Sequence, residues 1–343
     1  MKALITGGAG VLGSTLTKLL LRMGHQVTVL DSCRKEEAWR LFEDVGSINY
    51  IWKSEQDITV TDLYNYDIIF DCAIGFADRP FGSESPQNTT SSNIFPSLSL
   101  LEKVRRLERR PLVVYPSSFN ALYGLGDNVT ITEEALPSPT SIYGWTKAAV
   151  ELLYRTYYYA YGIPVVITRT SSTFGPGGRS DELPHKLILS ILDHQRSFPL
   201  RSPQAKRLWT FSKDVSSFYE AFIAKFEEEA HIFPGKILHL GGNKDDRITT
   251  NIELANLISY IADSDTEIIE DEYEAGEVVN GKPVTFVQNA VETREFLNWK
   301  PNYSLENSLK ETIEWFKDHK FRYNSTASNM SKKPARLGRI TGK

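Results

Sequence analysis

The sequence has little cysteine, no long apolar run and no excess of basic residues. Its two cysteines, Cys33 and Cys72, cannot form a disulfide framework, so a reducing cytoplasm is the expected compartment. No apolar run approaches the ~20 residues that span a membrane, and the predicted first strand starts at residue 2, which leaves no room for a signal peptide. The net charge of -4 gives no basic field for nucleic acid. The six histidines show no paired spacing with cysteines or carboxylates, so we expect no metal site.

A glycine-rich run, Thr6–Gly13, is the most informative feature of the chain. It follows the apolar residues Ala3–Ile5 and precedes a helical stretch, Ser14–Met23, which is the order of a buried strand, a turn and a helix. This order predicts a dinucleotide site in which the anion rests on the helix N-terminus. An ordinary strand-to-helix turn without a ligand is the alternative.

Each glycine of the run has a distinct expected use. Gly7 permits the tight turn, Gly10 lets the backbone approach a pyrophosphate, and Gly13 lets the helix pack close to the strand. Val11 and Leu12, between the last two glycines, complete the predicted cofactor-binding turn.

An acidic residue follows the second apolar run. Gln26–Leu30 ends in Asp31, whose carboxylate would accept both ribose hydroxyls and repel a 2′-phosphate. This favours NAD over NADP, although Arg34 could stabilise a 2′-phosphate.

Apolar runs alternate with helical segments through the first half of the chain. The alternation predicts an α/β fold, a Rossmann doubly wound parallel sheet with a smaller C-terminal substrate-binding lobe. We expect an NAD-binding domain over residues 1–175 with a returning strand near 236–240, a substrate-binding lobe over 176–321, and a disordered tail over 322–343. The later strands are expected at Ser47–Trp52, Asp67–Cys72, Pro111–Pro116, Ile163–Thr168 and Lys236–Leu240. The later helices are expected at Lys35–Val45, Asn93–Arg109, Ile142–Tyr161, Leu183–His194, Ser212–Glu229, Asn251–Ala262 and Leu305–Asp318.

Tyr143 and Lys147 open one of these helices. Their spacing of four places both side chains on one helical face. A tyrosine has a pKa near 10, and lowering it by about three units requires roughly 4 kcal/mol of differential stabilisation of the phenolate. The Lys147 ammonium and an oxidised nicotinamide are two cations that could supply it, so that Tyr143 takes a proton while hydride leaves for NAD. An amphipathic helix with a core tyrosine and a surface lysine is the alternative.

With these motifs the chain resembles the extended short-chain dehydrogenase/reductase family over residues 1–318. That family has T-G-x-x-G-x-x-G, an acid after the second strand, Asp-Ile after the third, a serine-rich fifth strand and Y-x-x-x-K. Asn93 could equally cap a helix. The resemblance implies further cofactor-binding residues, namely Asp57, Ile58, Cys72, Ala73, Ile74, Asn93 and Ser117, and also cofactor contacts for Tyr143 and Lys147.

Within the family the chain looks like the NAD-dependent sugar-nucleotide epimerase/dehydratase branch. In that branch an arginine in the region of Arg207 binds the substrate diphosphate, because a guanidinium fork matches phosphate oxygens. A surface salt bridge is the alternative for Arg207. The resemblance is carried by Tyr123-Gly124, Arg169, Phe174-Gly175-Pro176, Arg207, Leu240-Gly241-Gly242, Asn298-Trp299-Lys300-Pro301 and Leu305–Trp315.

The chain departs from the branch at Phe119, where the branch has a catalytic serine or threonine. Ser118 could act instead if the turn is displaced by one residue. The dehydratase subgroup has Asp and Glu at the next two positions, where this chain has Asn120 and Ala121, which disfavours that two-carboxyl mechanism. Asn120 and the segment around Ser172 are locally most similar to CDP-tyvelose 2-epimerase and its relatives, which implies substrate contacts for both residues.

The resemblance predicts an NAD-dependent nucleotide-sugar epimerase that oxidises a ring hydroxyl transiently. Tyr143, Lys147 and Ser118 are the expected catalytic residues, and Asn120, Ser172 and Arg207 the expected substrate-binding residues. A nucleotide-sugar 4-dehydrogenase or a variant dehydratase is the alternative, and a non-catalytic NAD-sensing protein is an alternative of another class. The expected partner is a nucleotide-diphosphate sugar, not nucleic acid or a membrane.

The resemblance also implies a homodimer. In this family the two helices expected at Asn93–Arg109 and Tyr143–Tyr161 usually pair across a two-fold axis. Tyrosines at helical spacings, Tyr154, Tyr157, Tyr158 and Tyr161, would suit such an interface, although an intramolecular core accounts for them nearly as well.

Overall fold

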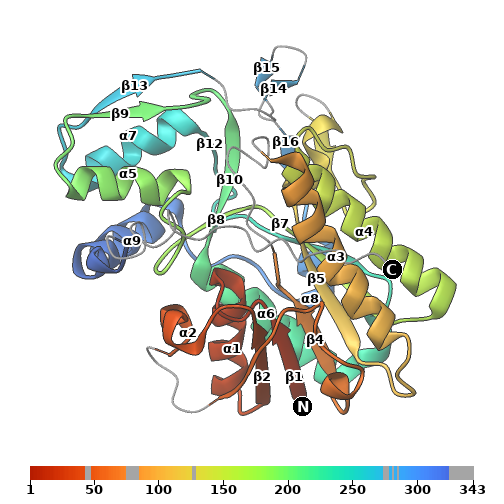
Figure 1. Cartoon of the computed structure of the whole chain (residues 1–343). Coiled ribbons are helices and arrows are strands. Elements are labelled where there is room, and N and C mark those ends of the chain that lie inside the picture. The colour runs from red at the N-terminus through yellow and green to blue at the C-terminus, as the bar shows by residue number, and fades with distance from the viewer. Residues whose placement is uncertain are drawn as a thin grey trace.

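The computed structural model of the chain describes residues 1–42, 48–74, 85–125, 129–272, 278–279, 282–283 and 286–323. Seven strands form its central sheet: β1 (Lys2–Thr6), β2 (Gln26–Asp31), β3 (Asn49–Trp52), β4 (Ile68–Asp71), β5 (Leu112–Ser118), β7 (Val165–Thr170) and β11 (Ile237–Leu240). Their order is β11-β7-β5-β4-β1-β2-β3, and every neighbouring pair is parallel (Figure 1). The predicted doubly wound parallel sheet is therefore confirmed.

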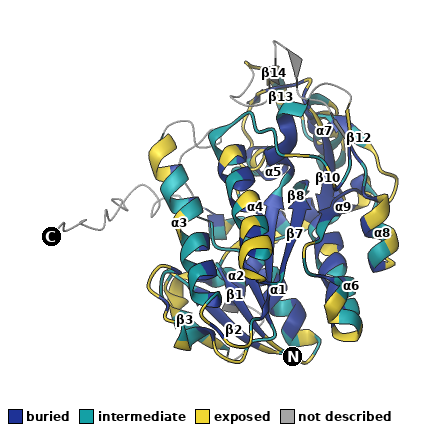
Figure 2. Ribbon diagram, turned by 90° about the vertical axis from the view of Figure 1, so that its right-hand side faces the viewer, coloured by how far each residue is buried: buried dark blue, intermediate teal, exposed yellow. Residues whose placement is uncertain are grey.

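Helices cover both faces of the sheet. α1 (Val11–Arg22) and α6 (Ser212–Glu229) pack on one face, and α3 (Pro86–Val104) and α4 (Ile142–Tyr161) pack on the other. Strands buried on both faces are apolar at successive positions, as the run from Ala3 to Ile5 shows. Figure 2 shows the resulting buried centre between exposed outer helix faces. Parallel strands all end at one edge, so the segments that follow β1, β4 and β5 meet there.

A second core lies beyond the carboxyl edge of this sheet (Figure 1). It is built on the sheet of β8 (Ser172–Phe174), β10 (Lys206–Phe211) and β12 (Ile248–Thr250), with helices α5 (Leu183–Leu192), α7 (Asn251–Ala262) and α9 (Leu305–His319). β8 follows β7 almost directly and β10 runs into α6, so the chain crosses between the two cores more than once.

Shorter elements complete the described part of the chain. The 3₁₀ turns are η1 (Lys35–Glu37), η2 (Thr61–Leu63), η3 (Phe119–Leu125) and η4 (Ala230–Ile232). The remaining helices and strands are α2 (Trp39–Phe42), α8 (Val291–Leu297), β6 (Val129–Ile131), β9 (Ser197–Leu200), β13 (Glu267–Glu270), β14 (Val278–Val279), β15 (Lys282–Pro283) and β16 (Phe286–Gln288). No helix among the described residues is long and apolar enough to cross a membrane.

Most predicted helices are present, and three of them, α4, α6 and α7, have the predicted ends. α3 differs because it begins at Pro86 and not at Asn93. Proline is preorganised for the first helical turn, but the polar residues that follow it lack the apolar period that signals a helix. The helix predicted over 35–45 consists of η1 and α2 in the described part, and residues 43–47 lie outside it, as do residues 324–343 of the predicted tail.

A buried ion pair fixes α4 against β7. Nη2 of Arg169 on β7 donates to Glu151 of α4 at 2.9 Å, and its Nη1 donates to the carbonyl of Glu133 at 3.1 Å. Arg169 is fully buried and Glu151 is 1% exposed. Two charges in such a place are stabilising only as a hydrogen-bonded pair. The position of α4, which carries Tyr143 and Lys147, therefore depends on this pair.

Truncation of Glu151 to alanine should leave the Arg169 charge buried without its partner. We expect the free energy of unfolding in urea to fall by about 3–5 kcal/mol. The matched control is Glu306→Ala, which removes the exposed pair with Lys310 and should cost far less, because water screens an exposed ion pair. Equal losses in the two variants would contradict the stated role of the buried pair.

Candidate cofactor and substrate site

The turn after β1 lies close against the end of β4. Gly7 has a φ of +63°, and a Cβ atom there would lie 2.7 Å from the Cα of Ala73. A Cβ atom at Gly13 would lie 2.3 Å from the carbonyl oxygen of Gly7. Side chains are thus excluded at both positions, and the predicted tight turn and close helix packing are present.

Unpaired backbone donors begin α1. Gly10 is the N-cap and supplies no side chain, and the N–H of Ser14 makes a helical hydrogen bond to the Gly10 carbonyl at 3.0 Å. The N–H groups of Val11, Leu12 and Gly13 precede that bond and have no acceptor within the helix. With the positive end of the helix dipole they suit an anion, so this turn fits the diphosphate of a dinucleotide.

Asp31 ends β2 beside the same turn. One carboxylate oxygen accepts the N–H of Ala9 and the other accepts the N–H of Cys33, both at 2.8 Å. A carboxylate has further acceptor positions, so Asp31 can hold the turn and still accept ribose hydroxyls. The guanidinium of Arg34, the possible partner of a 2′-phosphate, lies 5.3 Å from the ring centre of Trp52.

α4 begins against the segment that follows β5. Ser141 caps the helix by accepting the N–H of Gly144 at 3.0 Å, and a Cβ atom at Gly144 would lie 2.3 Å from the carbonyl oxygen of Asn120. One turn later Lys147 donates to the carbonyl of Pro116 at 2.8 Å. Burial lowers the pKa of Lys147 to about 8. The predicted pair of Tyr143 and Lys147 therefore lies at the carboxyl end of β5, not on an exposed surface.

Ser118, the last residue of β5, contacts the Tyr143 hydroxyl. Burial raises the pKa of Tyr143, and the side-chain hydrogen bond with Ser118 opposes that rise. The N–H and the side-chain amide of Asn120 both donate to the Ser118 oxygen at 3.2 Å. Phe119 points instead into the core, with its ring 4.8 Å from that of His239. Ser118 thus lies beside Tyr143, where the one-residue displacement would put it.

Two further side chains at this edge have buried polar atoms that make no hydrogen bond within the described part of the chain. The Asn93 amide donates to Thr146 at 3.0 Å, while its buried oxygen accepts no hydrogen bond from any residue that the structure describes. Within the same described ranges, the buried Ser117 hydroxyl has no hydrogen-bond partner either. Buried polar atoms of this kind are rare unless a ligand or water satisfies them. Asn93 lies inside α3, whose N-cap is Ser85, so Asn93 does not cap that helix.

The remaining predicted cofactor residues lie in loops. Cys72, Ala73 and Ile74 follow β4 directly and are half-buried beside the glycine turn. The Ile58 side chain is buried in the core on the α3 side, and Asp57 is exposed. The structure does not bring the Ile58 side chain to the cofactor edge, so an adenine contact by this pair stays a prediction.

The predicted substrate residues lie on two neighbouring segments. Arg207 on β10 is buried, and its guanidinium lies 5.3 Å from the ring centre of Tyr123 in η3, the turn that also carries Asn120. Ser172 on β8 is half-buried and pairs in register with Trp209 of β10. Arg207 therefore lies against the turn that carries Asn120, and Ser172 lies on the strand next to that of Arg207.

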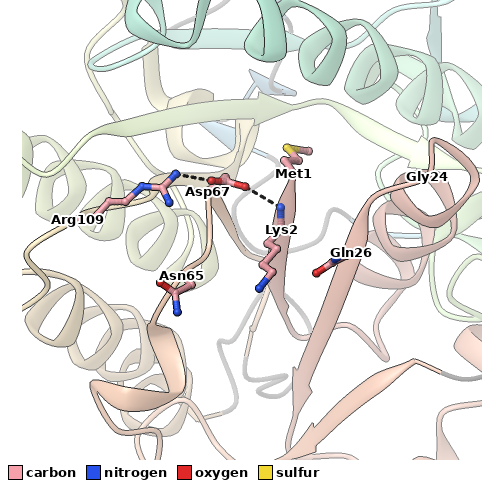
Figure 3. Close-up of a pocket in the computed structure, with 7 residues that line it drawn as sticks. All are labelled: Met1, Lys2, Gly24, Gln26, Asn65, Asp67 and Arg109. Atoms are coloured by element: carbon pink, nitrogen blue, oxygen red, sulfur yellow. Dashed lines mark hydrogen bonds and ion pairs between the residues drawn. The ribbon is translucent and has the colours of Figure 1, made fainter.

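Another hollow, of about 500 Å³, opens at the opposite edge of the sheet (Figure 3). There Asp67 accepts the N–H of Lys2 at 2.7 Å and pairs with Arg109. Ligands of parallel α/β sheets bind at the carboxyl ends of the strands, so this amino-edge hollow is not the predicted site. Among the described residues, no three His, Cys, Asp or Glu side chains come together as a metal site would need.

Thr146 and the carbonyl of Pro116 are two further polar groups at this edge that the sequence motifs did not indicate. Thr146 accepts from Asn93, and Pro116 positions Lys147. Thr146 lies between the two residues of the Y-x-x-x-K motif, and this position could have predicted that it lies near the site. A backbone carbonyl leaves no trace in the sequence.

A model of the "NAD dependent epimerase/dehydratase family" matches residues 3–241. The UDP-N-acetyl-alpha-D-glucosaminuronate decarboxylase of Bacillus cytotoxicus is 28% identical, over 92% of this chain and 98% of its own length. The dTDP-glucose 4,6-dehydratase of Neisseria meningitidis is 26% identical, over 100% of this chain and 99% of its own length. The structure of UDP-glucuronic acid 4-epimerase from Bacillus cereus, in complex with UDP-glucuronic acid and NAD, has a TM-score of 0.81 and 22% identity, covering 93% of this chain and 100% of that one. These proteins catalyse three different reactions, so the likeness alone does not select one.

Replacing Gly7 by alanine should abolish the retention of NAD by the purified protein. The new Cβ would push apart the turn and Ala73, which displaces the N–H groups of α1. Gly24→Ala is the matched control, because Gly24 also has a positive φ, +84°, but nothing lies within 4 Å of its Cβ position. Both variants carry a similar strain of about 1–2 kcal/mol, so native mass spectrometry should find NAD only with the control. A folded Gly7→Ala protein that keeps its NAD would show that the turn is not the cofactor site.

Proposed function

Because the chain belongs to the NAD-dependent epimerase/dehydratase family, we propose that it epimerises a nucleotide-diphosphate sugar by transient oxidation of one ring hydroxyl. Its cofactor is NAD, and its general class is that of the sugar-nucleotide epimerases and dehydratases. The choice of epimerisation within this class is the proposal. It is supported by the residues around Tyr143.

Tyr143 is the proposed base for the substrate hydroxyl. Its pKa is raised by burial, so the phenolate needs nearby stabilisation. Ser118 supplies a hydrogen bond, and the Lys147 ammonium, held by the Pro116 carbonyl, supplies positive charge on the same helix face. When bound, NAD supplies the hydride acceptor and, in its oxidised form, a further positive charge.

The contact between Ser118 and the Tyr143 hydroxyl is the observation that carries this proposal. Phe119 occupies the position at which related enzymes have the catalytic serine or threonine, and it is buried in the core. With Ser118 beside the tyrosine hydroxyl, the hydrogen-bonding role passes to the preceding residue. The chain thus retains a tyrosine, a lysine and a serine for proton transfer.

Elimination of water would need an acid and a base near the sugar. Asn120 and Ala121 provide neither, since Asn120 donates to Ser118 and Ala121 is buried. A variant dehydratase, a 4-dehydrogenase and a non-catalytic NAD-sensing protein are separated from the epimerase by the experiment below.

The proposed substrate-binding residues lie on η3, β8 and β10. Arg207 is the proposed ligand of the diphosphate, and its buried guanidinium favours a tightly held anion over a surface salt bridge. Asn120 and Ser172 are the proposed sugar contacts. We retain the division into a cofactor part, residues 1–175, and a substrate part, residues 176–321, as part of this proposal.

We also propose a cytoplasmic location and a homodimer. Neither cysteine of the chain forms a disulfide bond, which suits a reducing compartment. α4 carries exposed Trp145, Leu152 and Tyr159 at intervals of seven, on one outer stripe of the helix. A second copy of the same stripe across a two-fold axis would cover them.

The tyrosines that were predicted to suit this interface lie in different environments. Tyr154 is fully buried and donates to Asp71 at 2.5 Å, and Tyr157 donates to Glu102 at 2.6 Å. These two therefore serve the internal core. Tyr161, at 46% exposure, remains available for an interface.

The function is tested by titrating the purified protein with a panel of CDP-, UDP-, GDP- and dTDP-sugars and following sugar products and NADH absorbance. We expect retained NAD, an epimerised product of one nucleotide sugar and no net NADH. Tyr143→Phe should keep NAD but lower turnover by about 10²–10⁴, whereas Tyr260→Phe, at an 82% exposed tyrosine, should not. Stoichiometric NADH would identify a dehydrogenase and loss of water a dehydratase. Unchanged cellular function of Tyr143→Phe would favour the NAD-sensing class.

The dimer is tested by changing Leu152, which is 51% exposed, to glutamate. A desolvated charge at the two-fold axis should shift the protein to monomer in analytical ultracentrifugation. Ile269→Glu, at a 47% exposed residue of β13, is the control and should leave the mass unchanged. A wild-type protein that is monomeric at micromolar concentration would refute the dimer.

A further inference from the structure

A buried carboxyl group that has no part in the proposed function lies beneath the cofactor turn. Glu55, in the loop after β3, is 3% exposed. Its side chain contacts Asp71 and Thr6, and neither of its carboxyl oxygens accepts a hydrogen bond by ordinary donor geometry in the described part of the chain. An ionised carboxylate in such a place would lack all the donors that normally stabilise it.

Asp71, at the end of β4, has the opposite surroundings. Three hydroxyl groups donate to its carboxylate, from Thr6 at 3.2 Å, Ser97 at 2.7 Å and Tyr154 at 2.5 Å. Hydrogen bonds to the ionised form keep a carboxyl group ionised. Of the two neighbouring carboxyls, Asp71 is therefore the one built to carry the charge.

Two carboxyl groups in contact hold together only when one of them keeps its proton. Burial, and then the negative charge of Asp71, raise the pKa of Glu55 well above its ordinary value. Glu55 is thus the neutral partner, and its O–H is the donor that Asp71 can still accept. The pair bears one negative charge where two ionised groups would bear two.

The pair lies next to both halves of the cofactor site. Asp71 is in register with Thr6, the residue before Gly7, and the N–H of Ala73 donates to the Thr6 hydroxyl at 3.3 Å. On the other side, the charge of Asp71 acts on Lys147 and opposes the fall of its pKa. The other titratable groups that act on the pair are Asp31 on β2, Cys72 after β4, Lys103 on α3, Tyr115 on β5 and Tyr154 on α4, while Glu151 acts on Lys147.

We propose that Asp71 is a positioning residue for Lys147 and that Glu55, by sharing its proton with Asp71, keeps the charge beneath the cofactor turn at one. The single negative charge holds Lys147 as an ammonium at its place by the Pro116 carbonyl. A second negative charge would lie under the turn that binds an anion. The role of Lys147 rests on the proposed function, but the state of the carboxyl pair does not.

The state of the pair is tested first on the protein without substrate. The infrared difference spectrum between wild type and Glu55→Gln should contain the band of a protonated carboxylic acid at neutral pH. In the unfolded chain Glu55 ionises near its ordinary pKa of about 4.3. Above that pH, folding of the wild-type protein includes protonation of Glu55, so the free energy of unfolding falls as pH rises. Glu55→Gln lacks this cost, so the urea midpoint of the variant should rise relative to that of wild type as pH increases from about 5 to about 8.

Glu108→Gln, at an exposed residue, is the control and should show neither change. Absence of the protonated band, or a pH-independent difference between Glu55→Gln and wild type, overturns the shared proton. Failure to bind NAD or a sugar nucleotide would instead count against the proposed function and leave these two readouts intact.

The positioning role is tested by titrating NAD into each variant over a range of pH. In wild type the affinity should weaken as Lys147 loses its proton near pH 8. Asp71→Asn, made together with Glu55→Gln so that Glu55 cannot ionise in place of Asp71, removes the opposing charge, so this loss should move to lower pH by on the order of one unit. Glu55→Gln keeps the Asp71 charge, so the pH at which NAD affinity is lost should stay the same as in wild type.

An unshifted loss in the double variant Asp71→Asn/Glu55→Gln overturns the positioning role, because a purely structural effect would lower stability without moving this pH. If the double variant does not fold, Glu55→Gln alone decides. A shift to lower pH in that variant would show that Glu55, and not Asp71, carries the charge.

Discussion

The close contact between Gly7 and Ala73 is the constraint on which the site depends. A side chain at residue 7 would meet the backbone of Ala73 at 2.7 Å, so only glycine lets the turn after β1 lie against the end of β4. The same approach puts Thr6 beside Asp71, to which it donates at 3.2 Å. The glycine turn and the buried carboxylate of Asp71 are therefore parts of one packing arrangement.

A one-residue displacement after β5 decides what stands beside Tyr143. The strand extends to Ser118 and η3 begins at Phe119, whose ring packs on His239 in the interior. The Asn120 carbonyl then lies so close to Gly144 that no side chain fits between them. This contact presses the first turn of α4 onto the end of β5, which brings Tyr143 to Ser118 and Lys147 to the Pro116 carbonyl.

Buried charges surround α4 on its inner side. Glu151 pairs with Arg169 of β7, and Tyr154 donates to Asp71 of β4. Loss of either contact would leave a buried charged group without its partner, which is costly because water cannot reach the group. α4 is consequently tied to two strands at fixed positions, and with it the side chains of Tyr143 and Lys147.

The sequence determined the fold class, the glycine turn, Asp31 and the Tyr143–Lys147 spacing, since each depends on the order of residues within one strand, turn or helix. The ends of α4, α6 and α7 also followed from apolar period and capping, whereas the start of α3 did not, because its first turns are polar. Only the tertiary structure decided that Ser118 meets Tyr143 and that Phe119 fills the core. It alone also brought Glu55 to Asp71, because that contact joins a loop and a strand whose separation in space is set by the packing of the whole sheet, and not by any local pattern.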